Sequence, residues 1–316
     1  MKLALIGFGN VGRAFAHLLE AKRLAYPFRI VAIHTARHGT AFSEKRLTPE
    51  PEFGPPSASI DEFLDRAKAD VVVELTTLHP HTGEPAITHI RKAFSRQAHV
   101  VTANKGPIAV AYRQLCREAR EAGVEFRFES TCMDGAPVFN LVRNTLPGVQ
   151  IRGFAGVLNS TTQVVIAAMR RGASLEEGIL EAQSSGIAEA DASYDIDGWD
   201  SAAKTAALAN VLMDAGITPV DVQRTGIADL TPQYIQTLAA KRRTVCLVAR
   251  ASATSFVVSP EELDEGDVFA ALTGTSNLLL LHTDLMGTIG TISIAPGVQQ
   301  TAYGVFSDIV DIARNL

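Results

Sequence analysis

The chain has 316 residues, of which 47% are hydrophobic and 20% are charged. This length favours two domains or one large α/β unit, and so much apolar material excludes a disordered chain or a small disulfide scaffold. Its 29 basic and 34 acidic residues give a formal net charge of -5, which argues against nucleic acid and anionic membranes as partners.

The first part of the chain predicts alternating strands and helices. A strand at 2–6, a helix at 11–21 and a strand at 29–33 form one βαβ unit, and the segment 40–59, rich in Pro, Ser and Glu, predicts a loop. The alternation continues with a helix at 60–67, a strand at 71–75, a helix at 84–95, a strand at 99–102, a helix at 110–122 and a strand at 124–129. Continuous apolar strands that alternate with helices are typical of a Rossmann-type doubly wound parallel sheet in an α/β protein.

The regular alternation of strands and helices ends in the second part of the chain. It predicts a strand at 150–158, helices at 161–171, 175–184 and 202–213, a β-rich alternation at 287–295 and a final helix at 302–312. We therefore expect a dinucleotide-binding domain at 1–133 and a second, α+β domain for substrate binding, catalysis and dimerisation at 134–297. The C-terminal helix, within 298–316, is expected to pack back on the first domain.

Gly7, Gly9 and Gly12 form the pattern G-x-G-x-x-G, directly after the first strand and at the start of the first helix. In a dinucleotide-binding turn the first glycine permits the tight turn, the second lets backbone amides approach the pyrophosphate, and the third lets the helix pack closely on the strand. We expect this turn to bind a dinucleotide, with Asn10 and Val11 at the helix start. A purely structural glycine turn is the alternative.

The end of the second strand distinguishes NADP from NAD, because an acid there binds the ribose 2′-hydroxyl and repels a 2′-phosphate. Residues 33–38 contain no acid, and Arg37 can pair with the phosphate. This favours NADP, unless Arg37 is a solvated charge on a loop.

Two lysines stand out. Lys105 follows Asn104 at the carboxyl end of a buried strand, where open α/β sheets bind ligands, although a solvated lysine on a loop is equally common. Lys204 lies four residues after Asp200 across a predicted helix start, so the two side chains share one face and Asp200 occupies a capping position. Such pairs are common on helix surfaces, but the helix 202–213 is almost wholly apolar or small. A lysine there is costly and chemically tunable, which favours a functional Lys204.

These segments resemble the homoserine dehydrogenase family. The resemblance runs through nearly the whole chain and rests on residues 7–12, 102–109, 128–137 and 186–204. The last segment is the most specific, because Glu189, Asp195, Asp200 and Lys204 keep the spacing of the family. The resemblance implies oxidation of the primary alcohol of homoserine to aspartate 4-semialdehyde with NAD(P), or the reverse reaction.

The resemblance also implies roles for single residues. Lys204 and Lys105 would flank the reacting oxygen, with Lys204 as the proton donor and acceptor and Asp200 orienting it. An ammonium group can stabilise and protonate the alkoxide that develops when hydride reaches the semialdehyde. Further roles are substrate binding by Glu189, which would hold the substrate ammonium, and Asp195, and cofactor contacts at Gly304 and at Thr76 or, alternatively, Thr77.

The structural Na+ or K+ site of the family resembles Glu129 together with the carbonyl oxygens of Cys132, Asp134 and Ala136, since an alkali cation prefers hard oxygen ligands. The chain departs from the family at Ser160 and Gln163, where many members have Gly and Asn, and at 295–301, which is poorer in glycine than usual. These departures put the pocket details, and with them the exact substrate, in doubt.

Two other functions are considered. A dehydrogenase of another amino acid or of a hydroxy acid would share the plan, but a substrate without an amino group would have no use for Glu189. A non-catalytic NADP-binding sensor would need the glycine turn but not a lysine on an apolar helix.

The remaining expectations concern the cellular setting. The three cysteines, Cys116, Cys132 and Cys246, are widely spaced, which argues against a disulfide framework and a zinc knuckle. No signal peptide or membrane-spanning stretch is recognisable, so we expect a cytoplasmic protein. Analogy with the family suggests a homodimer, and the length leaves no residues for an appended amino-acid-sensing domain or a fused kinase.

Overall fold

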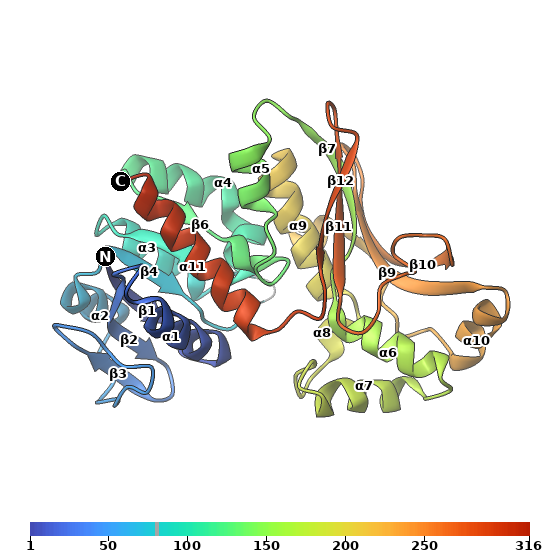
Figure 1. Cartoon of the computed structure of the whole chain (residues 1–316), viewed down its shortest axis with the longest axis horizontal. Coiled ribbons are helices and arrows are strands. Elements are labelled where there is room, and N and C mark those ends of the chain that lie inside the picture. Colours follow the sequence, from blue (N-terminus) through green and yellow to red (C-terminus); the bar gives the residue numbers. More distant parts are fainter. Residues whose placement is uncertain (80–81) are drawn as a thin grey trace. The chain divides into compact units, whose positions relative to one another are not determined.

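The computed structural model describes the whole chain except residues 80 and 81. The chain forms two compact units, one from Met1–Asn140 with Gly297–Leu316 and the other from Leu141–Pro296 (Figure 1). The expected boundary at residue 133 falls a few residues before the observed one. The difference arises because the backbone N–H groups of Val138, Phe139 and Asn140 all donate to the Glu129 carboxylate, which holds this segment to the first unit.

The first unit contains a six-stranded sheet with the order β3-β2-β1-β4-β5-β6. Its strands are β1 (Lys2–Ile6), β2 (Arg29–Thr35), β3 (Gly39–Phe42), β4 (Val71–Glu74), β5 (His99–Thr102) and β6 (Phe126–Arg127). All neighbours are parallel except β2 and β3. The chain leaves β1 toward β2 on one side and returns to β4 on the other, so the order reverses between β1 and β4. Ligands of doubly wound sheets bind at the carboxyl ends of the strands at such a point. The prediction of a Rossmann-type sheet is confirmed.

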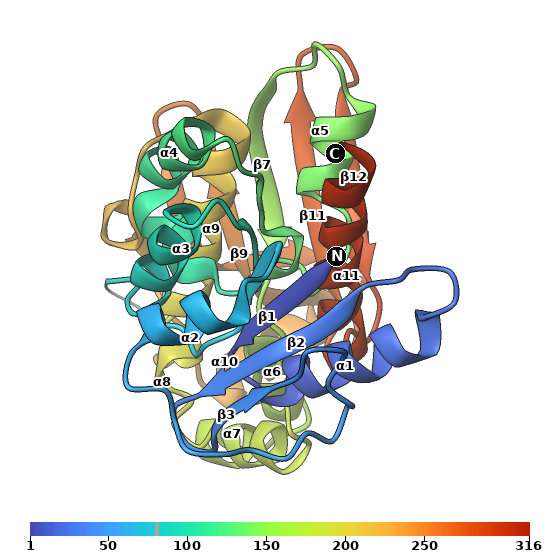
Figure 2. The same cartoon turned by 90° about the vertical axis from the view of Figure 1, so that its left-hand side faces the viewer.

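Helices cover both faces of this sheet. They are α1 (Asn10–Lys22), α2 (Ile60–Ala67), α3 (Ala86–Phe94), α4 (Lys105–Ala122) and α11 (Val298–Arg314). A 3-10 turn at Glu129–Thr131 follows β6, and α5 (Phe139–Thr145) begins in the first unit and ends in the second. Helices α1 and α11 lie side by side on one face (Figures 1 and 2). Phe15 of α1 and Val305 and Ile309 of α11 are completely buried against Leu3 and Leu5 of β1. This shared core holds the C-terminal helix in the first unit.

The segment 40–59, predicted as a loop, begins with a strand instead. β3 runs antiparallel to β2 after a turn at 36–38, and Thr40 pairs with Gly54 further along. Gly39 adopts φ +89°, a left-handed conformation that lets the chain reverse. A four-residue edge strand is too short for its alternation to stand out from a Pro- and Ser-rich surrounding.

The second unit has a sheet with the order β12-β11-β7-β9-β10-β8. Its strands are β7 (Ile151–Val157), β8 (Gln223–Arg224), β9 (Arg243–Ala251), β10 (Phe256–Asp264), β11 (Asn277–Thr283) and β12 (Thr288–Ser293). Its helices are α6 (Ser160–Arg170), α7 (Leu175–Ser184), α8 (Ser193–Ile196), α9 (Trp199–Met213) and α10 (Pro232–Ala240), with a 3-10 turn at Pro219–Asp221. Helices α6, α9 and α10 contact the sheet. The prediction of an α+β second domain is confirmed.

Long strands β9 and β10 were not recognisable from sequence. Charged side chains within the two strands pair with each other, as Arg250 does with Glu261 at 2.7 Å and Arg243 with Glu262. These charges interrupt the apolar alternation on which strand prediction depends. No helix in the described part of the chain is long and apolar enough to span a membrane.

Candidate active site

The glycine turn joins β1 to α1 with little room for side chains. Gly7 adopts φ +97°, and a Cβ atom there would lie 2.6 Å from the carbonyl oxygen of Leu75. A Cβ atom on Gly12 would lie 3.3 Å from the carbonyl oxygen of Gly7, whereas one on Gly9 would meet nothing within 4 Å. Gly7 is thus required by packing, Gly12 lies in a tight contact, and Gly9 leaves open space beside the helix N-terminus. No side chain caps this helix N-terminus, and an uncapped helix N-terminus beside open space fits a pyrophosphate.

Arg37 lies at the same edge of the sheet. It is exposed in the turn between β2 and β3, and β2 is the neighbour of β1. The carboxyl ends of these two parallel strands meet at one edge, so Arg37 and the glycine turn lie at the edge where such sheets bind ligands.

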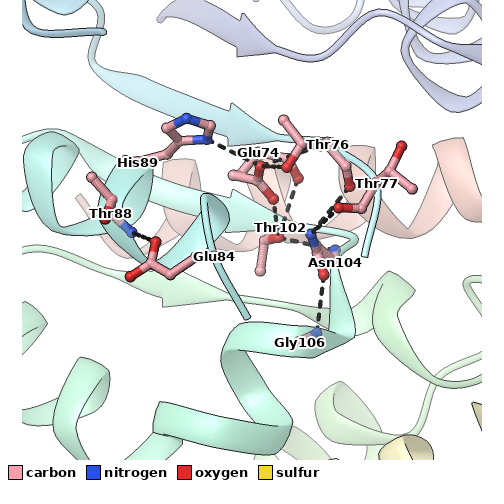
Figure 3. Close-up of polar contacts among 9 residues, drawn as sticks. All are labelled: Glu74, Thr76, Thr77, Glu84, Thr88, His89, Thr102, Asn104 and Gly106. Carbon is pink, nitrogen blue, oxygen red and sulfur yellow. Dashed lines mark hydrogen bonds and ion pairs between the residues drawn. The ribbon is translucent and has the colours of Figure 1, made fainter. Parts of the chain in front are cut away.

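Lys105 and Thr76 follow adjacent strands. Lys105 is the half-buried first residue of α4, directly after β5, and Thr76 follows β4. α4 begins at Lys105, earlier than the expected residue 110, because the Asn104 side chain caps it by accepting from the N–H of Gly106 at 3.0 Å. The same side chain donates to the carbonyl oxygen of Thr76 at 3.1 Å (Figure 3). The two loops are therefore bonded to each other.

Sequence reasoning missed Glu74, the completely buried acid at the end of β4. Its carboxyl group accepts hydrogen bonds from the hydroxyl groups of Thr76 and Thr102 (Figure 3). An acid that closes an otherwise apolar strand at the edge where ligands bind was a signal that could have found it.

In the second unit, Lys204 and Asp200 form an ion pair on α9. The Nζ atom of Lys204 lies 3.0 Å from Oδ2 of Asp200 and donates to the carbonyl oxygen of Leu158 at 2.6 Å. Their side chains are only 16% and 11% exposed, so this is not an ordinary surface pair. The expected capping role of Asp200 is wrong: Gly198, in the left-handed conformation, is the N-cap, and Asp200 lies inside the first turn.

Asn159 connects this pair to Asp195. Its Nδ2 group donates to Oδ1 of Asp195 at 2.6 Å and to Oδ2 of Asp200 at 2.9 Å, while its Oδ1 atom accepts from the N–H of Thr162 at 2.8 Å and caps α6. The buried Asn159 was not selected from the sequence as a site residue. An asparagine followed by Ser-Thr-Thr at a helix start was the available signal.

Burial raises the pKa of the Asp195 carboxyl group, the neighbouring Asp200 raises it further, and the hydrogen bond from Asn159 opposes both effects. Burial, Asp200 and Asp195 also raise the pKa of Tyr194. Its buried hydroxyl group has no hydrogen-bond partner in the part of the chain that the structure describes. The cluster is therefore a polar, partly desolvated site rich in negative charge.

Glu189 is placed differently. Its side chain is exposed in the loop after α7, where Gln183 donates to its backbone carbonyl oxygen at 3.0 Å. Among the residues that the structure describes, no bond links the Glu189 carboxylate to Asp195, Asp200 or Lys204. The structure thus brings three of the four spaced residues together.

Comparison with known families decides what these features belong to. Residues 137–310 match the family model described as homoserine dehydrogenase, and residues 7–129 match the model of the NAD-binding domain of homoserine dehydrogenase. The chain belongs to the homoserine dehydrogenase family. The resemblance stated from sequence is confirmed, and the chain is an NAD(P)-dependent oxidoreductase.

Several homoserine dehydrogenases match it over nearly their whole length. The enzyme of Methanocaldococcus jannaschii is 34% identical over 99% of this chain and 98% of its own. An NAD(+)-dependent homoserine dehydrogenase of Pseudomonas canavaninivorans is 32% identical over 99% of this chain and 96% of its own. The crystal structure of a putative homoserine dehydrogenase from Archaeoglobus fulgidus has a TM-score of 0.89 at 29% identity and 99% coverage of both chains. A hyperthermophilic archaeal homoserine dehydrogenase in complex with NADPH has a TM-score of 0.85 at 27% identity, covering 100% and 98%.

Ser160 and Gln163, the two residues that depart from the homoserine dehydrogenase pattern, each make a hydrogen bond within the second unit. The Ser160 hydroxyl donates to the carbonyl oxygen of Thr275 at 2.8 Å, and Gln163 donates to that of Ser276 at 2.6 Å. Both side chains fasten the start of α6 to the segment before β11. They replace smaller residues with bonds inside the second unit.

The expected cation site lies in the loop after β6. The Glu129 carboxylate accepts the backbone N–H groups of Val138, Phe139 and Asn140 at 2.6–3.0 Å. In the described part of the chain, no group of three His, Cys, Asp or Glu side chains could hold a metal ion. A cation here would accordingly depend on the carbonyl oxygens of Cys132, Asp134 and Ala136.

Gly304 is explained by packing. It lies inside α11, and a Cβ atom there would come within 2.3 Å of the Ser130 hydroxyl and 2.9 Å of the Gly135 Cα. A cofactor contact at Gly304 stays a prediction.

Proposed function

We propose that this homoserine dehydrogenase interconverts L-homoserine and L-aspartate 4-semialdehyde with Lys204 as the proton donor and acceptor at the reacting oxygen. The observation that carries the assignment is the position of its Nζ atom, fixed between the Leu158 carbonyl oxygen and the Asp200 carboxylate. Two acceptors on rigid elements orient the ammonium group in advance, which is what acid–base catalysis requires. Asp200 acts through Lys204 as its orienting partner.

The nicotinamide cofactor, when bound, supplies or accepts the hydride. The chain's own contribution in the reducing direction is to stabilise the developing alkoxide and to deliver a proton to it from Lys204. In the oxidising direction the same nitrogen takes the alcohol proton. Lys105 is the second lysine that we assign to the reaction.

Glu189 and Asp195 are proposed to bind the homoserine ammonium group. A cation beside Asp195 would favour its ionised form and offset the effects that raise its pKa. Because Glu189 is exposed in the described structure, its part in this contact requires the loop after α7 to bring the carboxylate to the substrate.

We propose NADP as the preferred cofactor, held by Gly7, Gly9, Asn10, Val11 and Gly12 at the pyrophosphate and by Arg37 at the 2′-phosphate. The open space at Gly9 and the exposed Arg37 on the same sheet edge support this preference. The NADPH complex of the archaeal relative supports it too, whereas the NAD(+)-dependent relative makes NAD the alternative. Thr76, or Thr77 in its place, would contact the nicotinamide half, together with Lys105.

The test follows nicotinamide absorbance with purified protein, either cofactor, and homoserine, threonine or a hydroxy acid as substrate. Turnover of homoserine with NADP above all other combinations is expected. Faster turnover of a hydroxy acid would favour the alternative dehydrogenase.

Three further assignments, a bound cation, the oligomeric state and the location, complete the proposal. A Na+ or K+ ion would bind the carbonyl oxygens of the loop after Glu129, and replacing both ions with tetramethylammonium should then lower the melting temperature. A homodimer is supported by the exposed Ile292 and Ile294 at the edge strand of the second unit, and sedimentation measures it. A cytoplasmic location is proposed from the enzyme class.

A further inference from the structure

Glu74 occupies the middle of the first sheet at the edge where a cofactor binds. It ends β4 and pairs in register with Ile6 of β1 on one side and Thr102 of β5 on the other. The glycine turn follows Ile6 directly, and the loop to Lys105 follows Thr102. Glu74 therefore lies between the two loops to which we assign cofactor contacts.

The carboxyl group is completely buried and fully engaged (Figure 3). One oxygen, Oε1, accepts from the backbone N–H of Thr76 at 3.2 Å and from its hydroxyl group, and lies 3.4 Å from Nδ1 of His89. The hydroxyl group of Thr102 lies between two acceptors of the same residue, the other carboxyl oxygen, Oε2, at 3.2 Å and the backbone carbonyl oxygen of Glu74 at 3.1 Å. These contacts join β4, its following loop, β5 and α3.

Asn104 closes this network into a ring. Its backbone N–H donates to the Thr102 hydroxyl at 3.0 Å, and its side chain donates to the carbonyl oxygen of Thr76 at 3.1 Å. Its remaining side-chain oxygen caps α4, whose first residue is Lys105. A displacement of Glu74 would thus be felt both at Thr76 and at Lys105.

Packing does not explain an acid at this position. The three preceding residues of β4 are valines, and burial of a carboxyl group is unfavourable unless hydrogen bonds compensate it. A carboxyl group with two acceptor oxygens suits the donors of Thr76 and Thr102, whereas an amide would present a donor to one of them. The choice of an acid follows from the ring of donors around it.

We propose that Glu74 is a positioning residue for cofactor binding, which acts by holding the loops that carry Thr76 and Lys105 in fixed positions. This inference rests on the proposed cofactor contacts of those two residues. Hydride transfer is sensitive to small displacements, because misplacement by about 1 Å can lower a rate about 100-fold.

The experiment uses the full chain and compares the wild type with Glu74→Gln, which keeps the volume and removes one acceptor. NADPH affinity is measured by fluorescence titration, and kcat and KM are measured for NADPH and homoserine separately. We expect NADPH affinity and kcat to fall about 10-fold or more, with the homoserine KM within about twofold of wild type. Thr102→Val should produce a smaller loss, and the double variant should lose less than the sum of both, because the two groups share one bond.

Asp311→Asn is the matched control. Asp311 is a carboxylate of the same unit that accepts from Nε of Arg127 at 2.9 Å. This variant should lower the melting temperature without weakening NADPH binding. If Glu74→Gln does not fold, Thr102→Val alone carries the test.

If folded Glu74→Gln has the NADPH affinity and kcat of the wild type, the positioning role is overturned, whatever the melting temperature. If only Thr102→Val folds, the same result in that variant overturns it. Failure of the underlying assignment is distinguishable, because Thr76→Val and Lys105→Met would then both bind NADPH as tightly as the wild type does. That outcome would overturn the cofactor contacts and the inference with them.

Discussion

The Nζ atom of Lys204 lies 3.0 Å from Oδ2 of Asp200, one turn away on α9, and both side chains are nearly buried. The carbonyl oxygen of Leu158 accepts from the same nitrogen at 2.6 Å. An isolated pair at this spacing on a helix surface contributes only about 0.2–0.5 kcal/mol to stability. This pair is buried beside Asn159 and Asp195, so we assign it the role of orienting the Lys204 ammonium group and not that of stabilising the helix.

Asp200→Asn should therefore lower kcat about 10-fold to 100-fold, because the amide keeps the shape but no longer orients the ammonium group by charge. NADPH affinity should not change, since Asp200 lies in the second unit. Steady-state kinetics and fluorescence titration measure the two effects. Asp214→Asn, at the other end of the same helix, is the control and should retain wild-type kcat. Equal loss in both variants would refute the orienting role.

Asn159→Asp should be more damaging than Asn159→Ala. The alanine variant loses a helix cap, worth about 1 kcal/mol, and two bonds to carboxylates. The aspartate variant adds a third carboxylate where Asn159 now donates to Asp195 and Asp200. We expect its kcat to fall further and to recover partly as the pH is lowered.

The matched control is Asn210→Asp, because Asn210 is a second buried asparagine of the same unit, lies on α9, and bonds the backbone N–H and carbonyl oxygen of Ile217. It should lose stability and keep its kcat in the folded protein. A kcat loss in this control as large as that of Asn159→Asp would show that any buried negative charge disrupts the unit.

The raised pKa of Asp195 predicts that the stability of the folded protein depends on pH. Its pKa is raised in the folded protein from an ordinary value of 3.8, mainly by burial. Between these two pKa values the folded state binds more protons than the unfolded state, so the free energy of unfolding decreases as the pH rises through this range. Asp195→Asn removes this loss, and its melting temperature relative to wild type should rise with pH.

Thermal unfolding in a series of buffers above pH 3.8 measures this difference. Asp191→Asn is the comparison, because the backbone N–H of Ser193 donates to this exposed carboxylate and its pKa is lowered. It should show no such rise with pH. A constant or shrinking advantage of Asp195→Asn would contradict the predicted direction.

Arg37→Ala should change cofactor preference. Losing a charge-assisted bond to the 2′-phosphate is expected to raise the KM for NADPH about 10-fold or more and to leave the KM for NADH unchanged. Arg120→Ala, an exposed arginine at the end of α4, is the control and should alter neither. An unchanged NADPH KM in Arg37→Ala would remove the argument for NADP.

Much of the fold followed from residue patterns with a clear period. The apolar strands β1, β4 and β5 and the glycine turn predicted the first sheet, because buried parallel strands have continuous apolar runs. Strands β9 and β10 were missed because charged residues such as Arg250 and Glu261, which pair with each other in the fold, interrupt the apolar pattern of the sequence.

The site was predictable where spacing along one helix determines proximity. Asp200 and Lys204 are neighbours because four residues make about one helical turn. Asn159 and Glu74 were not found, because their partners come from other parts of the chain: Asn159 bonds Asp195 and Asp200, and Glu74 bonds Thr102. Only the fold brings such residues together.

The most direct test of the central claim is the initial rate of NADP reduction with L-homoserine in the wild type and in Lys204→Met, whose side chain has similar length and no charge. Lys241→Met, an exposed lysine of the same unit, is the control. We predict turnover in the wild type and in the control, and a kcat about 100-fold to 10,000-fold lower in Lys204→Met with unchanged NADPH affinity. Turnover by Lys204→Met within a few-fold of wild type, or no homoserine oxidation by the wild type, would contradict this account.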